Sequence, residues 1–381
     1  MMRLPTIEDA GKLEGKRVLV RFDLNAAVAH GTVVDSFRLD KAISTFDLLR
    51  QKKAKVIALS HISVGKGYDS LRPMLDYLNG FFPIKFCPTY FTKEADSMVA
   101  ELKDDEVLLF ENIRMNAGED ENDMEFAKKL AQYGDIFVNE AFSESHRKQA
   151  SIVLLPTLLP HYAGPLFLEE VENLSKCFSP SHPFLFILGG AKFQTKLPLI
   201  QKFLRSADTI FVGGALANDI FKARGFEVGT SLVSNNKNGT NFNIGELLTS
   251  KKFTYPIDVT VKKPDGSIEF RDADKFVIDE YIGDVGPQTI EKLKEVADKA
   301  KFILWNGPLG NYELGFKDKT EQLADILSHT GAETIIGGGD TLAAIQSLNI
   351  LEKFSFASTA GGAMLDFLAH ETLPGIEVLL E

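Results

Sequence analysis

Short, continuous apolar runs recur along the chain, and each is followed by a turn and then by a stretch whose apolar residues have helical spacing. Runs without polar alternation are typical of strands buried on both faces of a parallel sheet. The stretches with helical spacing between them are typical of crossover helices. Strands are predicted at residues 17–22, 55–60, 107–110, 136–139, 184–188, 209–212, 302–305, 334–336 and 354–358. Helices are predicted at residues 39–51, 123–132, 166–176, 287–301 and 319–329. The pattern favours an α/β fold of two lobes, each a doubly wound, Rossmann-like domain with a parallel sheet.

Proline residues mark the boundary between the two halves, and a length of 381 residues suits two hydrophobic cores better than one. Several prolines precede and follow the amphipathic segment 166–176, which predicts a linker, a hinge helix and a second linker. We expect an N-terminal domain at 1–165, the interdomain helix and linker at 166–182, and a C-terminal domain at 183–381. The last residues of the chain are candidates for packing back on the N-terminal lobe.

The balance of charge narrows the classes of partner. Lys and Arg number 42 against 53 Asp and Glu, so the net charge is −11, the wrong sign for binding nucleic acid or an anionic membrane. No segment reaches the roughly 18 apolar residues that a membrane span needs, and the N-terminus has no signal-peptide pattern. Cys87 and Cys177 have no metal or redox spacing, so we expect them to be buried or inert. These features favour a cytoplasmic protein whose partners are small molecules.

Charged and polar side chains follow the predicted strands of the first half. Ligands of doubly wound sheets collect beyond the carboxyl ends of the strands. One arginine or histidine at such a place is commonly a salt-bridged or structural residue, but the recurrence at four strand ends favours a cleft for a small, highly charged anion. The residues concerned are Arg21, Asp23, Asn25, His61, Glu111, Asn112, Arg114, Asn139, Glu140, His146 and Arg147.

Glycines follow the predicted strands of the second half instead. One glycine-rich turn often only closes a tight corner, but four in one half favour a nucleotide-phosphate site made from backbone N–H groups. The turns are Gly189-Gly190-Ala191-Lys192, Gly213-Gly214-Ala215, Gly337-Gly338-Gly339-Asp340-Thr341 and Ala360-Gly361-Gly362. Lys192 and Lys196 are four residues apart, so on a helix they share a face. Asp340 is either a helix N-cap or a ligand of Mg²⁺ that bridges nucleotide phosphates.

Other phosphate-handling motifs are absent from the sequence. It has no G-x-x-x-x-G-K-[ST], no G-x-G-x-x-G after the first strand, and no protein-kinase H-R-D with D-F-G. It also has no nucleophile elbow and no zinc pattern. A nicotinamide dehydrogenase, which the α/β rhythm alone would allow, is therefore disfavoured.

Taken in order, these motifs resemble the phosphoglycerate kinase family over about residues 16–374. The matching stretches are Arg21-Phe-Asp23-Leu-Asn25, Arg38, Ser60-His61, Glu111-Asn-Ile-Arg114, Asn139-Glu-Ala-Phe142 with His146-Arg147, Gly189-Gly-Ala-Lys192 with Lys196, Trp305-Asn-Gly-Pro308, Glu313 and Gly337-Gly-Gly-Asp-Thr341. The resemblance implies reversible phosphoryl transfer between 1,3-bisphosphoglycerate and ADP by a monomeric enzyme that uses Mg²⁺.

The resemblance also implies a role for each matching residue. The first half would bind 3-phosphoglycerate through Asp23, Asn25, Arg38, His61, Arg114 and Arg147. The second would bind ADP or ATP through Gly190, Ala191, Lys196, Gly213, Gly214, Asn306, Pro308, Glu313, Gly338, Gly339, Asp340 and Thr341, with Asp340 on the metal and Glu313 on the ribose. Charge on the moving phosphoryl group would be stabilised by Arg38, Lys192, Lys196, Gly339 and Gly362.

The sequence departs from the family pattern at several positions. Val64 stands where an arginine for the acid's phosphate is expected, and one lost charge-assisted contact is worth about 1.5–3 kcal/mol. Gln149 replaces a usual histidine, and Ala360 and Met364 replace a glycine and a serine. These departures leave open a second hypothesis, a non-catalytic member of the family that binds nucleotide.

Overall fold

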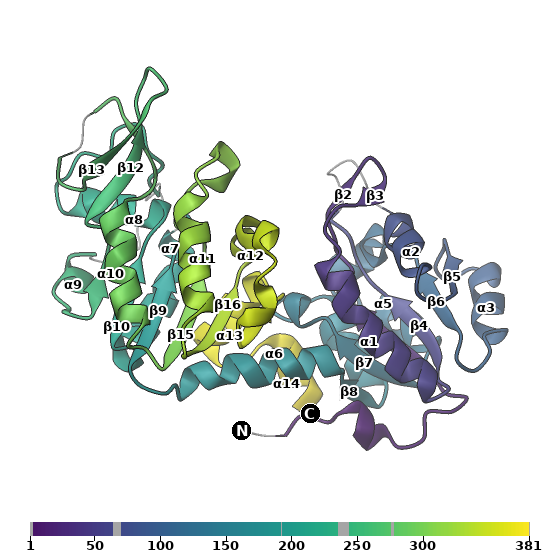
Figure 1. Cartoon of the computed structure of the whole chain (residues 1–381). Coiled ribbons are helices and arrows are strands. Elements are labelled where there is room, and N and C mark those ends of the chain that lie inside the picture. The colour runs from purple at the N-terminus through teal and green to yellow at the C-terminus, as the bar shows by residue number, and fades with distance from the viewer. Residues whose placement is uncertain (1–2, 64–69, 192, 235–243, 276–277, 381) are drawn as a thin grey trace. The chain divides into compact units, whose positions relative to one another are not determined.

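The computed structural model describes residues 3–63, 70–191, 193–234, 244–275 and 278–380. The chain divides into two compact units, one formed by Met1–Glu172 with His370–Glu381 and the other by Asn173–Ala369. The division falls within helix α6 (Pro165–Ser175), and the C-terminal residues belong to the first unit (Figure 1). Among the described residues, no helix has the length and apolar content needed to cross a membrane.

The first unit contains a six-stranded sheet in the order β5-β6-β4-β1-β7-β8, and all its strand pairings are parallel. A small antiparallel hairpin, β2 (Val28–Ala29) and β3 (Thr32–Val33), accompanies it. The strands of the sheet are β1 (Arg17–Phe22), β4 (Lys55–Leu59), β5 (Ile84–Cys87), β6 (Val107–Phe110), β7 (Ile136–Glu140) and β8 (His161–Ala163). The helices are α1 (Phe37–Gln51), α2 (Arg72–Leu78), α3 (Lys93–Ala100), α4 (Ala117–Asp120), α5 (Met124–Ala131) and α14 (Pro374–Leu380).

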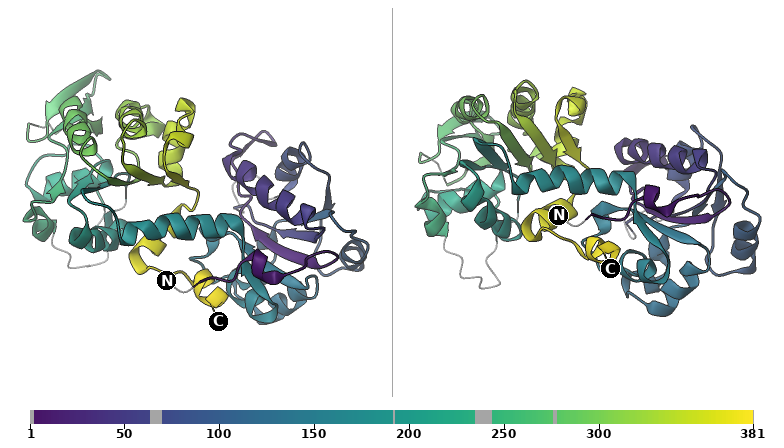
Figure 2. Two further views of the ribbon diagram at one scale, coloured as in Figure 1. Left: turned by 60° about the horizontal axis from the view of Figure 1, so that its bottom comes forward. Right: turned by 90° about the horizontal axis from the view of Figure 1, so that it is seen from below.

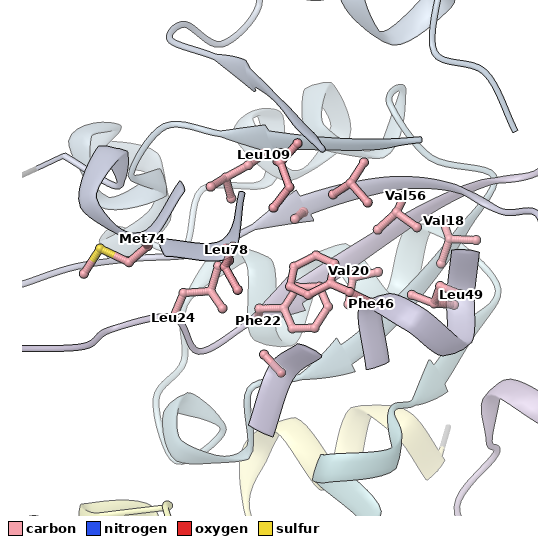
Figure 3. Close-up of a cluster of buried hydrophobic side chains, with 14 of the residues drawn as sticks. Val18, Val20, Phe22, Leu24, Phe46, Leu49, Val56, Met74, Leu78 and Leu109 are labelled. Carbon is pink, nitrogen blue, oxygen red and sulfur yellow. The ribbon is translucent and has the colours of Figure 1, made fainter. Parts of the chain in front are cut away.

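Alternate residues of each strand in this sheet enter two different cores. In β1, Val18, Val20 and Phe22 pack with residues of α1 and α2, whereas Leu19 packs on the opposite face with residues of α3 and α5. Phe22 stacks on Phe46 of α1 with ring centroids 4.1 Å apart (Figure 3). This burial on both faces explains why the strands have continuous apolar sequences, and it fixes α1, whose first turn carries Arg38, over the sheet.

The second unit contains a six-stranded sheet in the order β11-β10-β9-β15-β16-β17, again parallel throughout, with helices on both faces (Figure 2). The strands are β9 (Phe184–Leu188), β10 (Thr209–Val212), β11 (Phe253–Thr254), β15 (Phe302–Asn306), β16 (Glu333–Gly337) and β17 (Phe356–Ser358). The helices are α7 (Phe193–Ser206), α8 (Ala215–Ala223), α9 (Ile244–Leu248), α10 (Pro287–Ala297), α11 (Asp318–Ser328), α12 (Gly339–Ile345) and α13 (Gly362–His370). An antiparallel sheet is formed by β12 (Asp258–Lys262), β13 (Ile268–Asp272) and β14 (Tyr281–Val285).

The strand order of the second sheet identifies where a ligand is expected. The chain runs outward from β9 through β10 to β11, then returns to the other side of β9 with β15, β16 and β17. The order therefore reverses between β9 and β15, and in open α/β sheets ligands bind at the carboxyl ends of the strands beside such a reversal. The turns that begin at Gly189 and Gly307 follow these two strands.

The structure confirms the predicted α/β fold with two doubly wound parallel sheets. The strand bounds at 17–22, 107–110, 184–188 and 209–212 agree with prediction. The sequence pattern did not predict the short strands β5, β8 and β11, or the antiparallel sheet of β12, β13 and β14. Cys87 and Cys177 are buried and free, as expected.

Candidate functional site

The residues predicted to bind an acid lie at the carboxyl edge of the first unit's sheet. Asp23 follows β1, and its carboxylate forms an ion pair of 2.9 Å with Arg38 in the first turn of α1. The Asn25 backbone N–H donates to Asp23 Oδ1 at 3.1 Å, and the Asn25 backbone carbonyl accepts from Arg38 Nη1 at 3.4 Å. Three of the predicted residues, Asp23 and Asn25 from the loop after β1 and Arg38 from α1, thus form one group.

The other three predicted residues converge on a carboxylate that the sequence analysis did not single out. Glu144, at the end of the 3₁₀ helix Phe142–Glu144, places Oε1 3.1 Å from His61 Nε2. Its Oε2 accepts a short hydrogen bond from Arg114 Nη2 and lies 3.4 Å from Arg147 Nε. Ser143, the neighbour of Glu144, donates to Asp23 Oδ2, so both groups of residues belong to one cluster.

Burial and neighbouring charge decide which of these groups are ionised. Burial lowers the pKa of His61, although the Glu144 carboxylate opposes that shift, so the imidazole is neutral at physiological pH. Burial alone would raise the pKa of Glu144, but the hydrogen bond from His61 and the charges of Arg21 and Arg114 hold it well below its ordinary range. Glu144 is therefore a carboxylate anion across the working pH range.

Arg21, the arginine within β1, is a structural residue of this cluster. It is fully buried, and it donates to Ser151 Oγ at 2.9 Å and to the Phe22 carbonyl at 2.6 Å. Its Nη2 lies 3.3 Å from His61 Nδ1, and because a guanidinium only donates, Nδ1 accepts and the ring proton is on Nε2, facing Glu144. Arg21 thus sets the orientation of His61.

In the second unit, a cavity of about 230 Å³ opens beside the strand-order reversal between β9 and β15. Its predicted lining residues are Gly190, Ala191, Gly214, Pro308, Glu313 and Asp340. The rest of the wall is largely apolar and aromatic, and includes Phe221, Val259, Leu309 and Tyr312. A cavity with glycines and carboxylates on its wall together with apolar and aromatic side chains can hold a polyphosphate joined to a planar base.

Close approach between loops explains the glycines on this wall. A Cβ at Gly189 would lie 2.2 Å from the Pro308 carbonyl oxygen, and one at Gly214 would lie 2.6 Å from the Gly190 nitrogen. Gly214 and Gly307 also have φ values of 61° and 94°, which residues other than glycine rarely adopt. Glycine is thus required here to bring three strand-to-helix turns into contact, and this contact forms the wall.

Lys196 lies buried behind that wall. Its Nζ donates to the Gly189 carbonyl at 2.7 Å and to Asn306 Oδ1 at 3.2 Å, and it lies 3.3 Å from the position of a Cβ on Gly190. Burial lowers the pKa of Lys196 to about 8, although the Asp340 carboxylate acts in the opposite direction. Lys196 is therefore a cation at neutral pH, and within the described part of the chain its direct hydrogen-bond acceptors are a carbonyl and an amide oxygen.

The glycine turn after β16 is held by its neighbours. Asn306 Nδ2 donates to the Gly337 carbonyl at 3.0 Å, and the Thr341 hydroxyl accepts from the Gly307 N–H at 2.7 Å. Thr341 is buried, whereas Gly339 and Asp340 are exposed at the start of α12, and no atom would lie within 4 Å of a Cβ on Gly339. Open backbone at this turn can therefore approach a ligand.

Asp340 is the candidate ligand of a metal ion. In the described part of the chain, no group of three or more His, Cys, Asp or Glu side chains could hold a metal by itself. Mg²⁺ at nucleotide sites commonly takes one or two carboxylates and completes its coordination with phosphates and water. Asp284, Glu313 and Asp340 all line the cavity, and Asp340, which is exposed at the start of α12, fits a Mg²⁺ ion of that kind.

The structure accommodates three of the departures from the family pattern. Ala360 is buried and is not among the residues with positive φ, whereas Gly361 beside it has a φ of 57°. Met364 is buried, with Sδ 3.6 Å from Asn306 Nδ2. Gln149 is also buried, and its amide donates to Asp120.

Two further predicted residues lie outside the lining of this cavity. Gly213 packs beside Phe211 and Leu309, and Gly362 is exposed at the start of α13. Lys192 and Val64 lie outside the described residues, so their predicted roles stay predictions.

Comparisons with known proteins identify one family over nearly the whole chain. A family model described as Phosphoglycerate kinase matches residues 7–371. A protein named Phosphoglycerate kinase from Dictyoglomus turgidum is 39% identical over 380 residues, which cover 96% of this chain and 96% of that protein. A protein of the same name from Methylorubrum extorquens is 39% identical over 393 residues and 98% of both chains.

Two solved structures have the same fold. The phosphoglycerate kinase from Coxiella burnetii superposes with a TM-score of 0.84 at 32% identity and covers 99% of both chains. The one from Pyrococcus horikoshii superposes with a TM-score of 0.86 at 29% identity, over 99% of this chain and 98% of that chain. The similarity therefore includes both units.

Proposed function

This chain belongs to the phosphoglycerate kinase family, and we propose that it catalyses reversible phosphoryl transfer between 1,3-bisphosphoglycerate and ADP, giving 3-phosphoglycerate and ATP. The observation that carries the proposal is the family match over residues 7–371. The arginine cluster of the first unit and the glycine-walled cavity of the second support it, because each suits one of the two substrates.

In the proposed complex, the first unit binds the acid. Arg38, Arg114 and Arg147 supply guanidinium groups, which suit phosphate and carboxylate because they can donate two parallel hydrogen bonds. His61 supplies a neutral N–H donor. Asp23 and Asn25 position Arg38 through the ion pair and the carbonyl contact described above.

The second unit binds the nucleotide in the same proposal. The predicted cavity residues surround it, with Glu313 on the ribose and Lys192 and Lys196 on the phosphates. Asp340 would hold a Mg²⁺ ion, whose charge would neutralise part of the polyphosphate. Gly190, Gly214 and Pro308 shape the wall around the phosphate chain.

The chemistry needs no general base. The nucleophile of the ATP-consuming direction is a carboxylate with an ordinary pKa of roughly 3.5 to 4, so it is already ionised at neutral pH. One of its oxygens forms a bond to the γ-phosphorus, the bond from that phosphorus to the bridging oxygen of ADP breaks, and ADP leaves with the electron pair. Catalysis therefore consists of positioning and charge stabilisation, which we assign to Arg38, Lys192, Lys196 and the backbone N–H groups of Gly339 and Gly362.

Because the two substrates are assigned to different units, we propose that the units close during the reaction about a hinge within residues 154–183. Closure would also exclude water, which otherwise hydrolyses the acyl phosphate. We further propose a monomeric enzyme of the cytoplasm. The family resemblance supports the monomer, and two free cysteines suit a reducing compartment.

The direct test is a coupled assay that measures ATP formed from 1,3-bisphosphoglycerate and ADP. We expect ATP formation that depends on both substrates and on Mg²⁺. Nucleotide binding without any transfer would support the non-catalytic hypothesis instead. No binding of either substrate would contradict both hypotheses.

A further inference from the structure

The carboxylate of Glu144 lies where the positive charge of the first unit's cluster is concentrated. Oε1 faces His61 Nε2 at 3.1 Å, and Oε2 faces both Arg114 and Arg147. The side chain of Glu144 is only 9% exposed, so it lies within the cluster and not on the surface above it. Three of the six residues assigned to the acid thus already have the Glu144 carboxylate as partner.

The other cations near this cluster have carboxylate partners of their own. Arg38 pairs with Asp23 at 2.9 Å, and Arg21 lies 3.9 Å from Glu119. Glu144 differs from these carboxylates because it contacts two arginines and the histidine at once. Among the residues that the structure describes, the other carboxylate paired with Arg114 is the exposed Asp120, at 3.8 Å.

A carboxylate is also the chemical group that an acid substrate would present to these donors. Both use the same N–H groups of arginine and the same N–H of His61, so both cannot satisfy them together. The low pKa of Glu144 keeps the internal anion charged at every pH at which the protein works. An incoming ligand therefore has to displace Glu144 or share its donors at a loss of affinity.

We propose that Glu144 is an affinity-determining residue that competes with the anionic group of the acid substrate for Arg114, Arg147 and His61. The inference rests on the proposed function and deepens it. Competition of this kind lowers the affinity for every anion, because each one has to displace Glu144 or share its donors.

The test compares Glu144→Gln with Asp120→Asn. Glutamine keeps the size of the side chain and removes its charge, and Asp120→Asn removes one charge beside the same Arg114 from an exposed position. In Glu144→Gln we expect the KM for 3-phosphoglycerate and the Kd for inorganic phosphate, measured by calorimetry, to fall about tenfold. Asp120→Asn should change both by less than about twofold, and the KM for nucleotide should not move in either variant.

Each outcome bears on the inference. An unchanged or weaker affinity for phosphate in folded Glu144→Gln would overturn it, and so would an equal gain in Asp120→Asn, because the effect would then be general electrostatics. If the wild-type protein transfers no phosphoryl group, the proposed function fails, but the Kd for phosphate still decides the role of Glu144. If Glu144→Gln does not fold, Glu144→Ala is measured, and failure of both to fold would assign Glu144 a structural role and overturn the inference.

Discussion

At the scale of single residues, the proposed chemistry depends on buried ionisable groups. Lys196 shows this most clearly, because two oxygen acceptors, the Gly189 carbonyl and Asn306 Oδ1, hold its ammonium in a buried position. Neither acceptor carries a full negative charge. The ammonium is therefore placed to gain much more from a phosphate than a lysine on the surface would gain.

The lowered pKa of Lys196 leads to a pH dependence with a definite sign. Below about pH 8 the free protein holds an ammonium, and above it an increasing fraction holds the neutral amine. Bound phosphate favours the charged form, so nucleotide binding should take up a proton as the pH rises past 8. We expect nucleotide affinity to fall by up to about tenfold per pH unit above that value, and calorimetry in two buffers of different ionisation enthalpy should detect the proton. A pH-independent affinity between about pH 7 and 9.5 would contradict this role.

A variant of Lys196 tests the same residue in catalysis. Lys196→Ala should lower turnover at least about 100-fold, the usual loss when one charge-stabilising donor is removed. Lys202 lies on the same helix, over the Phe178 ring, and Lys202→Ala is the matched control that should retain turnover. Similar losses in both variants would indicate damage to α7 instead of loss of a charge.

At the scale of elements, glycine turns and helix ends position the site. The Glu140 carboxylate accepts hydrogen bonds from the N–H groups of Leu166 and Phe167 at the start of α6, both at 3.2 Å, and from Thr45. A Cβ on Gly164 would collide with the same carboxylate, 1.9 Å from Oε2. This buried cap fixes the beginning of the helix that leads out of the first unit.

Burial raises the pKa of Glu140 from 4.5 to about 7, despite hydrogen bonds that act in the other direction. A folded-state pKa above the unfolded value means that the folded protein binds the proton more tightly, so stability falls as the pH rises from about 4.5 to 7. Glu140→Gln cannot ionise. As the pH rises from about 4.5 to 7, we expect the unfolding free energy of the variant, measured with urea, to increase by about 3 kcal/mol relative to that of the wild type. A difference in unfolding free energy between the two proteins that stays constant with pH would contradict the raised pKa of Glu140.

Two glycines with positive φ allow the cost of close packing to be measured apart from the cost of backbone strain. Gly214 has a φ of 61°, and a Cβ there would lie 2.6 Å from the Gly190 nitrogen, whereas Gly225 has a φ of 81° with no atom within 4 Å. Gly225→Ala should cost only the strain, about 1 kcal/mol of unfolding free energy. Gly214→Ala should cost at least about 2 kcal/mol more and should weaken nucleotide binding. Equal losses would show that the turns have room to move apart.

Helices and strands could be predicted from the sequence better than contacts between side chains. Strands such as β1 and β9 were predictable because burial on both faces leaves a continuous apolar run, whereas β13 alternates exposed and half-buried residues and has only two long apolar side chains. Glycine turns could be placed at strand ends, but spacing alone did not tell packing from ligand contact. Glu144 was missed because its partners are 83 and 30 residues away in the sequence, at His61 and Arg114. Its position two residues before His146-Arg147 was the only available signal.

At the scale of the whole molecule, each unit is proposed to bind one substrate, so phosphoryl transfer requires the two units to close. Small-angle scattering should therefore give a smaller radius of gyration with both substrates bound than with either alone. The hinge proposal predicts that binding of the nucleotide alone has a smaller effect. An unchanged radius under all conditions would contradict closure about residues 154–183.

The division of the two substrates between the units is most directly tested by a crystal structure of the protein with ADP, Mg²⁺ and 3-phosphoglycerate. We predict the acid within hydrogen-bond distance of Arg38 and Arg114, and the nucleotide in the cavity lined by Gly190, Gly214 and Glu313, with its phosphates toward Asp340. Both ligands bound to a single unit, or a nucleotide far from the turn at 337–341, would contradict the account.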